Sequence, residues 1–296
     1  MKVSKYHGTG NDFVMWVDLD DRHPQTPELV AALCDRHLGV GGDGTIRVTG
    51  SDRADFFMDY WNASGETAEM CGNGIRCLAK LVYDRGLTTA TEIDVDTRAG
   101  VKHLVLTVED GVVEAVRVDM GPPAFERSAL PMRGDGTFLD QPFEVEGTTY
   151  RAFGISMGNP HLVLIGDRDP REIEVRRIGP ALEHHEDFPE RTNVEFVRVV
   201  DGVIEVRVWE RGSGETMACG TGACAALVGA NLAGLAPRRS PVRFPGGVLD
   251  LEWAEDDRVF LRGPATFVFD AELSPVWVER ARAGRVVAPT PEGVAT

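Results

Sequence analysis

The chain has 296 residues, a hydrophobic content of 43% and a formal net charge of −16 at pH 7. This length and apolar content predict two packed domains, whereas the acidity disfavours a nucleic-acid partner, because phosphates are bound by concentrated Lys and Arg. No segment approaches the length of a membrane span and the N-terminus lacks the apolar run of a signal peptide, so we expect a cytoplasmic protein.

Strand patterns dominate both halves of the sequence. They cover 13–19, 45–50, 54–61, 104–109 and 112–120, and then 161–166, 194–200, 203–209, 248–253 and 258–263. Asp110–Gly111 and Asp201–Gly202 predict tight hairpin turns. Helix start and stop residues predict helices over 27–37, 72–85 and 220–233. The sequence therefore predicts an α+β fold that is mostly antiparallel and has few helices.

Short motifs recur at one fixed spacing. Cys71 in MCGNG and Cys219 in ACGTG lie 148 residues apart (219 − 71 = 148). The same offset relates two further pairs, Asn11 with Asn159 and Asn62 with Glu210. This repetition predicts a duplicated domain in which each copy directs one cysteine at a shared cleft. Racemisation of a carbon centre requires such a layout, with two similar groups on opposite sides of one atom.

The duplication suggests domain limits. Residues 1–118 form the expected N-terminal lobe, which carries Cys71 and is joined by about 266–280. Residues 119–265 form the expected C-terminal lobe, which carries Cys219. Residues 119–145 are rich in Pro and Gly and are expected to connect the halves, and 281–296 are expected to be a poorly ordered tail.

The cysteines favour neither a disulfide framework nor a metal site. There are five, an odd number, and none of their spacings matches a CxxC zinc motif. Cys34, Cys77 and Cys224 lie within apolar helical patterns and are expected in the core. The GVGGDG run at 39–44 has a helix before it and a strand after it. That order is the reverse of a dinucleotide-binding loop, so we interpret it as a glycine-rich loop bordering a cleft.

Cys71 and Cys219 each begin a predicted helix. The alternative, two buried small residues at helix starts, is disfavoured by the glycines and polar residues around both. Free N–H groups at a helix start lower a thiol pKa from about 8.5 to as little as about 3.5–7.5, and they bind anions such as a carboxylate. Two thiols on either side of one carbon also couple, so ionisation of the first raises the pKa of the second. We therefore expect one thiolate and one thiol.

The motifs resemble those of the diaminopimelate epimerase family, which are pyridoxal-independent amino-acid epimerases. The matching runs are KYHGTGNDF (5–13), NASGETAEMCGNGIRC (62–77), GNPH (158–161), RTNVEF (191–196) and ERGSGETMACGTGACA (210–225). The resemblance implies the interconversion of LL- and meso-2,6-diaminoheptanedioate, on the route to lysine and peptidoglycan, without a metal or cofactor. It also implies two pseudo-symmetric lobes, each a curled, mostly antiparallel sheet around a central helix.

The resemblance assigns roles by motif position. Cys71 and Cys219 are the expected acid–base pair, and His161 and Glu210 are expected near the thiols, tuning their pKa values. The residues expected to cradle the reacting carboxylate are Gly72, Asn73, Gly220 and Thr221. Those expected to bind the rest of the substrate are Asn11, Asn62, Asn159, Asn193, Glu210 and Arg211.

Arg211 departs from the internal repeat, and Gly44 departs from the family motif. Arg211 aligns with Ala63 under the repeat offset, and an unpaired guanidinium suits a second, non-reacting carboxylate. The alternative for Arg211 is an ion pair with Glu215 at i+4. Many family members carry Gln where this chain has Gly44, so a side-chain contact there is absent or supplied by water.

Two other readings remain open. A proline-racemase-like enzyme uses the same two-cysteine plan, but that family typically has His in place of Asn73 and Pro in place of Ala218. A non-catalytic amino-acid-binding module is disfavoured by the two intact cysteines. The sequence leaves the oligomeric state open, with a homodimer as one option.

Overall fold

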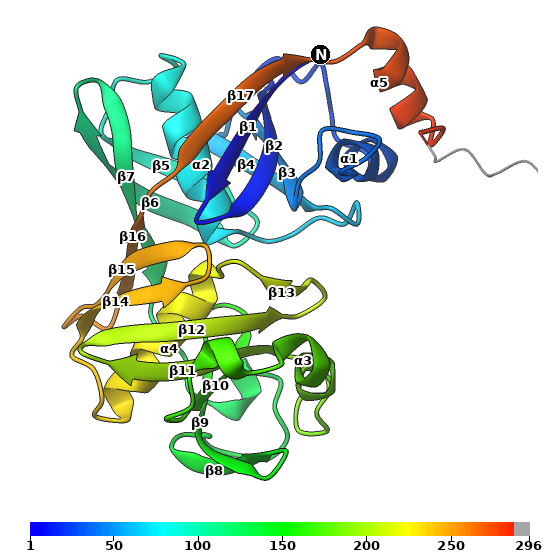
Figure 1. Ribbon diagram of the computed structural model, residues 1–296. Helices are drawn as coiled ribbons and strands as arrows, with labels where there is room; N and C mark the ends of the chain where they lie inside the picture. The colour runs from blue at the N-terminus through cyan, green and yellow to red at the C-terminus, as the bar shows by residue number, and fades with distance from the viewer. Residues whose placement is uncertain (287–296) are drawn as a thin grey trace, which may run out of the picture.

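The first half of the chain folds into a curled sheet around one helix. The computed structural model describes residues 1–286 (Figure 1). The first-half elements are β1 (Lys2–Gly8), β2 (Asn11–Val17), α1 (Pro27–Cys34), β3 (Gly44–Thr49), β4 (Phe56–Asn62), α2 (Gly72–Asp84), β5 (Glu92–Thr97), β6 (Gly100–Glu109) and β7 (Val112–Gly121).

The second half repeats this plan and then returns to the first. Its elements are β8 (Gln141–Val145), β9 (Thr148–Ser156), β10 (Pro160–Ile165), α3 (Val175–Glu183), β11 (Asn193–Val200), β12 (Val203–Glu210), β13 (Gly214–Thr216), α4 (Gly220–Leu232), β14 (Arg239–Phe244), β15 (Gly247–Trp253), β16 (Val259–Gly263), β17 (Thr266–Glu272) and α5 (Pro275–Arg282). Short 3-10 turns lie at Arg127–Ala129 and Pro170–Glu172.

The strand pairing shows the duplication directly. In the first half, β1–β2 and β3–β4 are antiparallel, while β2–β3 and β4–β5 are parallel. In the second half, β9–β10 and β11–β12 are antiparallel, while β10–β11 and β12–β14 are parallel. The chain is therefore an α+β protein of two pseudo-symmetric lobes, stacked one above the other in Figure 1.

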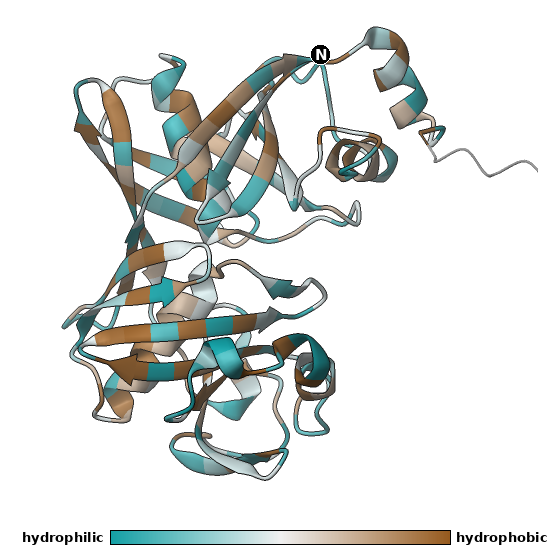
Figure 2. Ribbon diagram, viewed as in Figure 1, coloured by the Kyte–Doolittle hydropathy of each residue, from teal (hydrophilic) through white to brown (hydrophobic). Residues whose placement is uncertain are grey.

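Each lobe is built around its central helix. Residues 72–82 of α2 and most of α4 are buried, which is expected of helices enclosed by sheet on all sides. The sheet strands alternate accordingly: β12 alternates buried and partly exposed residues along most of its length, and Figure 2 shows this as alternating brown and teal bands. One core cluster includes residues of both α2 and α4 and so extends through both lobes.

Two features connect the lobes. β7 of the first half pairs with β16 of the second, with Val118 opposite Leu261. The chain then returns, and β17 pairs with β1 so that Glu272 lies opposite Lys2. Among residues 1–286, no helix is long and apolar enough to cross a membrane.

The predicted elements are all present, with small shifts at their ends. Both Asp-Gly turns have positive φ at each residue, 50° and 78° at Asp110–Gly111 and 50° and 77° at Asp201–Gly202, as expected for a tight hairpin. The first helix ends at Cys34 rather than at 37 because the Asp35 carboxylate accepts the N–H groups of His37 and Leu38, both at 2.8 Å.

Several elements lie outside the sequence prediction. The sequence patterns miss β1, β5, β8, β9, β13, β14, β17, α3 and α5. The last residues of the expected connection, 141–145, form β8 instead of loop. Helix α5 runs to Arg282 with Ala281 buried against α1, so ordered structure continues past the start of the expected tail. Residues 287–296 of that tail lie outside the described residues.

Candidate active site

Cys71 and Cys219 occupy equivalent positions, each as the N-cap of the central helix of its lobe. Each has an extended backbone, with φ −135° and −122°. The Cys71 sulfur accepts the N–H of Gly74 at 3.5 Å, and the Cys219 sulfur accepts that of Gly222 at 3.4 Å. An N-cap side chain satisfies one of the free N–H groups of the first helical turn, and here a thiol has that role twice.

The two helix starts touch each other. A Cβ added to Gly72 would lie 3.3 Å from the Cα of Gly220, and a Cβ added to Gly220 would lie 3.1 Å from the Cα of Gly72. Only glycine at both positions allows this approach. The first turns of α2 and α4 therefore lie side by side, and so do the positive ends of their two helix dipoles.

Asn73 connects the two halves at this point. Its side chain is 1% exposed, and its Nδ2 donates to the carbonyl of Ala218 at 2.9 Å and to Asn11 Oδ1 at 3.3 Å. The Cys71 thiol donates to the same Asn11 oxygen at 3.5 Å. Asn11 in turn donates to Asp43 at 2.8 Å, in the glycine-rich loop 39–44. Asn11, Asn73 and Cys71 thus form one hydrogen-bonded group.

A longer chain of contacts leads to Cys219. Thr221 Oγ1 lies 3.5 Å from the Cys219 sulfur, and Asn159 Nδ2 donates to that hydroxyl at 3.3 Å. His161 Nε2 lies 3.0 Å from Asn159 Oδ1. His161 therefore connects to Cys219 through Asn159 and Thr221.

The far end of this chain is a residue that the sequence analysis does not single out. Glu195 Oε1 lies 2.7 Å from His161 Nδ1, and both side chains are fully buried. Gly222 leaves the room for it, since a Cβ there would lie 2.6 Å from Glu195 Oε1. The sequence signal that could have identified Glu195 is a carboxylate between two apolar residues in the RTNVEF strand.

Burial dominates the electrostatics of both thiols. It raises the pKa of Cys71 to about 11, although the N–H of Gly74 acts in the opposite direction. It raises the pKa of Cys219 well above its usual value, and the charges of Glu210 and Glu195 add to this rise. The sequence predicts lowered pKa values. The shifts run in the opposite direction, because desolvation of the thiols outweighs the helix N–H groups.

Glu210 lies next to the second cysteine at the end of β12. Its carboxylate accepts the hydroxyl of Thr216, and it is close enough to Cys219 for each group to affect the pKa of the other. Burial raises the pKa of Glu210, and those two groups partly offset the rise. The charge of Glu210 raises the pKa of Cys219 more than that of Glu195 does, which agrees with the place of Glu210 in its motif.

Arg211 is exposed at the turn after β12, and its backbone is fixed from two sides. Asn193 Oδ1 accepts its N–H at 2.9 Å while Asn193 Nδ2 donates to the Pro160 carbonyl at 2.8 Å. On the other side, Glu183 accepts the N–H of Gly212 at 3.0 Å. Asn193 therefore shapes the site through the backbone.

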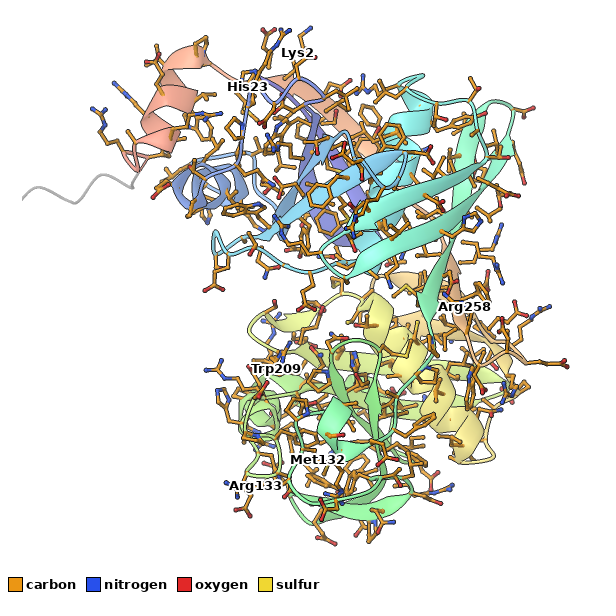
Figure 3. The ribbon with its side chains drawn as sticks, turned by 180° about the vertical axis from the view of Figure 1, so that it is seen from behind. Lys2, His23, Met132, Arg133, Trp209 and Arg258 are labelled. Carbon is orange, nitrogen blue, oxygen red and sulfur yellow. The ribbon has the colours of Figure 1, made fainter. Side chains whose placement is uncertain are left out.

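Two neighbouring contacts complete this region. Trp209, labelled in Figure 3, donates to Glu183 at 2.7 Å and so anchors the end of β12. Glu215 binds Arg176 and Arg207, and no ion pair joins it to Arg211 within residues 1–286. An ion pair of Arg211 with Glu215 is thus not supported. Within the described part of the chain, the Arg211 guanidinium donates to the Glu190 carbonyl at 3.4 Å.

Steric crowding explains why residue 44 is glycine and not a residue with a long side chain. A Cβ there would lie 2.6 Å from the Trp61 carbonyl oxygen and 2.8 Å from Cε2 of Tyr60. The Tyr60 ring therefore occupies the space that a longer residue at 44 would need. Its hydroxyl donates to Asn62 Oδ1 at 2.8 Å, so Tyr60 holds the side chain of one of the expected substrate-binding residues.

The chain is similar to known proteins over most of its length. It is 48% identical to diaminopimelate epimerase of Pelotomaculum thermopropionicum and 44% identical to that of Acetivibrio thermocellus, each over 92% of this chain and 98% of the relative. A probable proline racemase from Agrobacterium radiobacter shares the fold, with a TM-score of 0.69 and 14% identity over 94% of this chain and 95% of that one. Because residues 3–126 and 153–268 match the diaminopimelate epimerase family, the chain belongs to that family.

Proposed function

We propose that this protein interconverts LL- and meso-2,6-diaminoheptanedioate by two-base proton transfer between Cys71 and Cys219, in the synthesis of lysine and peptidoglycan precursors. The observation that carries this proposal is the contact of two cysteine-capped helix starts at Gly72 and Gly220. Relatives at 44–48% identity are diaminopimelate epimerases, which supports the choice of substrate over proline. The protein is thus an amino-acid epimerase, an isomerase.

The converging helix starts suit an α-carboxylate. Gly72, Asn73, Gly220 and Thr221 form the first turns of these two touching helices, where free N–H groups and helix dipoles favour negative charge. A carboxylate bound there places the α-carbon beside both N-cap sulfurs. Binding also stabilises the negative charge that moves onto the carboxylate when the α-proton is removed.

Proton transfer requires that one thiol be ionised. Because desolvation raises the pKa of both thiols, ionisation of one is helped by an internal base that accepts its proton. Glu210 influences the Cys219 thiol through its charge, and His161 connects to that thiol through Asn159 and Thr221. One sulfur, as thiolate, then takes the α-proton from one face, and the other, as thiol, delivers a proton to the opposite face. The roles reverse in the opposite direction.

The remote end of the substrate needs different partners. The exposed guanidinium of Arg211 suits the second carboxylate, which it can bind bidentately. Asn62 and Asn159 lie on the two lobes and offer amide groups to the rest of the substrate, while Asn11 supports Cys71. Arg211 has no counterpart under the repeat offset, as expected if only one end of the substrate reacts.

Isotope labelling tests the two-base mechanism. Starting from the LL isomer in D₂O, deuterium should appear in the meso product while unreacted LL substrate stays mostly protonated at early times. A single shared base would instead return label to both isomers from the outset. Cys71→Ala and Cys219→Ala should each abolish epimerisation, by more than the about 10²–10⁴-fold typical of one general acid or base. Substantial turnover by either variant contradicts the mechanism.

A substrate panel separates this function from its nearest rival. The protein is incubated with LL-diaminopimelate, L-proline and trans-4-hydroxy-L-proline without added cofactor, and the stereochemistry is followed. We expect change in the first substrate. Racemisation of proline in its place would assign the site to the proline-racemase reaction, and binding without turnover of any of the three would indicate a binding module.

The division of the chain follows from the same symmetry. The N-terminal lobe comprises 1–118 together with about 266–280, which include β17 on β1, and the C-terminal lobe comprises 119–265. A cytoplasmic location fits a precursor-synthesising enzyme. The strongly negative charge of the chain argues against binding to nucleic acid.

A homodimer would use the exposed edge of β17. Phe267, Val268 and Phe269 are 41%, 50% and 41% exposed there, an unusual apolar row for an edge strand. A second copy of the same strand is its proposed partner. Sedimentation of the wild-type protein and of Val268→Lys tests this: a monomeric wild type rules the dimer out, and a Val268→Lys dimer of unchanged stability rules out this edge.

A further inference from the structure

Arg76, in the second turn of α2, is a buried cation that has no anionic partner among the residues that the structure describes. It is 0% exposed and is the largest fully buried side chain. Its guanidinium donates only to neutral oxygens, namely Gly72 O at 2.8 Å, Asn73 Oδ1 at 3.1 Å, Thr9 Oγ1 at 3.4 Å and Pro264 O at 3.2 Å. Within residues 1–286, no carboxylate pairs with it.

A buried charge of this kind is costly. Hydrogen bonds to neutral groups offset part of the lost hydration, but an ion without a counter-charge in a low-dielectric interior remains unfavourable. Lys80, on the same helix, pairs with Asp84 at 3.2 Å. The repeat offset places Cys224, a neutral thiol, at the position in α4 equivalent to Arg76. The N-terminal lobe therefore carries a buried charge at this position of its central helix, whereas the C-terminal lobe does not.

Two contacts link this charge to the carboxylate cradle. The carbonyl of Gly72 faces the guanidinium, so the N–H of Asn73, at the other end of the same peptide, points away from it and is polarised toward any anion. Asn73 Oδ1 also faces Arg76, which turns Nδ2 toward Ala218 and Asn11. The contact between Gly72 and Gly220 places both helix starts near the same charge.

We propose that Arg76 is the counter-charge of the carboxylate cradle, a positioning residue that acts through Gly72 and Asn73. Its buried guanidinium stabilises the carboxylate as negative charge grows during removal of the α-proton, and it fixes the amide of Asn73 between the lobes. Low-dielectric surroundings strengthen such fixed charges in a transition state. The proposal rests on the proposed function, in which an α-carboxylate occupies the cradle.

The first test separates charge from hydrogen bonding at Arg76. Arg76→Lys keeps the charge and loses most of the hydrogen bonds, whereas Arg76→Gln keeps a donor and loses the charge. We expect Arg76→Gln to lose about 10²–10³-fold in kcat, the effect of removing one transition-state donor, and Arg76→Lys to retain clearly more activity. Arg85→Met, which removes an exposed cation at the end of α2, is the control. Equal activity of the Lys and Gln variants would overturn the proposal.

A second pair of variants leaves Arg76 in place. Thr9 is 4% exposed with a φ of 51°, a conformation that Asp and Asn both tolerate. Thr9→Asp sets a carboxylate beside Nη2 and neutralises the charge, while Thr9→Asn is its neutral counterpart of nearly equal shape. We expect the Asp variant to fold but to be at least about tenfold less active than the Asn variant, a loss equivalent to about 1.4 kcal/mol. Equal activity contradicts a role for the charge.

The reactivity of the Cys71 thiol, measured without substrate, tests the role of the Arg76 charge separately from the epimerase activity. The rate of Cys71 alkylation is followed by mass spectrometry from neutral to alkaline pH. Loss of the cation should move its pH dependence to higher pH in Arg76→Gln and Thr9→Asp, but not in Thr9→Asn. If the wild type does not epimerise diaminopimelate and this shift is present, the proposed function fails and the charge assignment stands. No shift in either variant overturns the assignment itself.

Discussion

Replacement of Gly220 by alanine should separate the two cysteines. The new Cβ would lie 3.1 Å from the Cα of Gly72 and 3.5 Å from Leu261 Cδ1, whereas carbon atoms pack at about 3.5–4.0 Å. Relief of the first contact requires a shift of about 0.4–0.9 Å between the helix starts. Overpacking of this kind costs about 1–3 kcal/mol of stability. A misplacement of about 1 Å costs about 10²-fold in rate, so a shift of half that size implies about a tenfold loss.

The assay combines thermal unfolding with the kinetics of Gly220→Ala. We expect a lower Tm and a kcat/KM about tenfold below wild type, the tenfold coming from the displacement argued above. Gly50→Ala is the matched control, because a Cβ there meets nothing within 4 Å. Wild-type stability and wild-type kcat/KM in Gly220→Ala would show that the helix contact neither limits the approach of the lobes nor sets the distance between the sulfurs.

Three further outcomes follow from the site and the core. Arg211→Met should raise KM sharply and also lower kcat, because binding energy at the remote carboxylate positions the reacting carbon; unchanged kinetics would exclude that role. Glu195→Gln should lower kcat/KM by about 10- to 100-fold, the loss seen when a residue that orients a functional histidine, such as a metal ligand, is replaced. A pH–rate profile equal to that of the wild type would contradict the action of Glu195 through His161. Burial raises the pKa of Cys77 to about 12, so the folded state holds this proton while the unfolded thiol loses it above about pH 8.5. Stability should therefore fall as the pH rises from about 9 toward 12, by up to about 1.4 kcal/mol per pH unit for this thiol, and Cys77→Val should reduce the slope measured by urea unfolding.

The sequence predicts the elements whose patterns are local and strong. Helices α2 and α4, the Asp-Gly hairpins and the strands with regular alternation follow from spacing and turn residues alone. The strand β17, by contrast, is exposed along nearly its whole length, so it carries little alternation of buried and exposed residues. Helix α3 contains Pro180, a residue that usually argues against a helix interior. Both depend on contacts distant in sequence.

The site is predictable in its residues but not in its electrostatics. The repeat offset and the motifs identify the two cysteines, and the structure brings them to touching helix starts. The direction of their pKa shifts depends on burial, which no local pattern reveals. Glu195 and Arg76 are missed for the same reason, because each is a charged residue inside an apolar or helical run whose depth becomes clear only after the lobes are assembled.

The pairing of β17 with β1 has a consequence for synthesis on the ribosome. The strand at residues 2–8 emerges first, yet its partner at 266–272 is made almost last. At about 5–20 residues per second, translation from the end of β1 at Gly8 to Thr266 takes about 13–52 s, during which one side of β1 has no partner strand. The nascent chain must keep this edge from pairing with neighbours. A release of the chain before residue 266 would leave it open permanently.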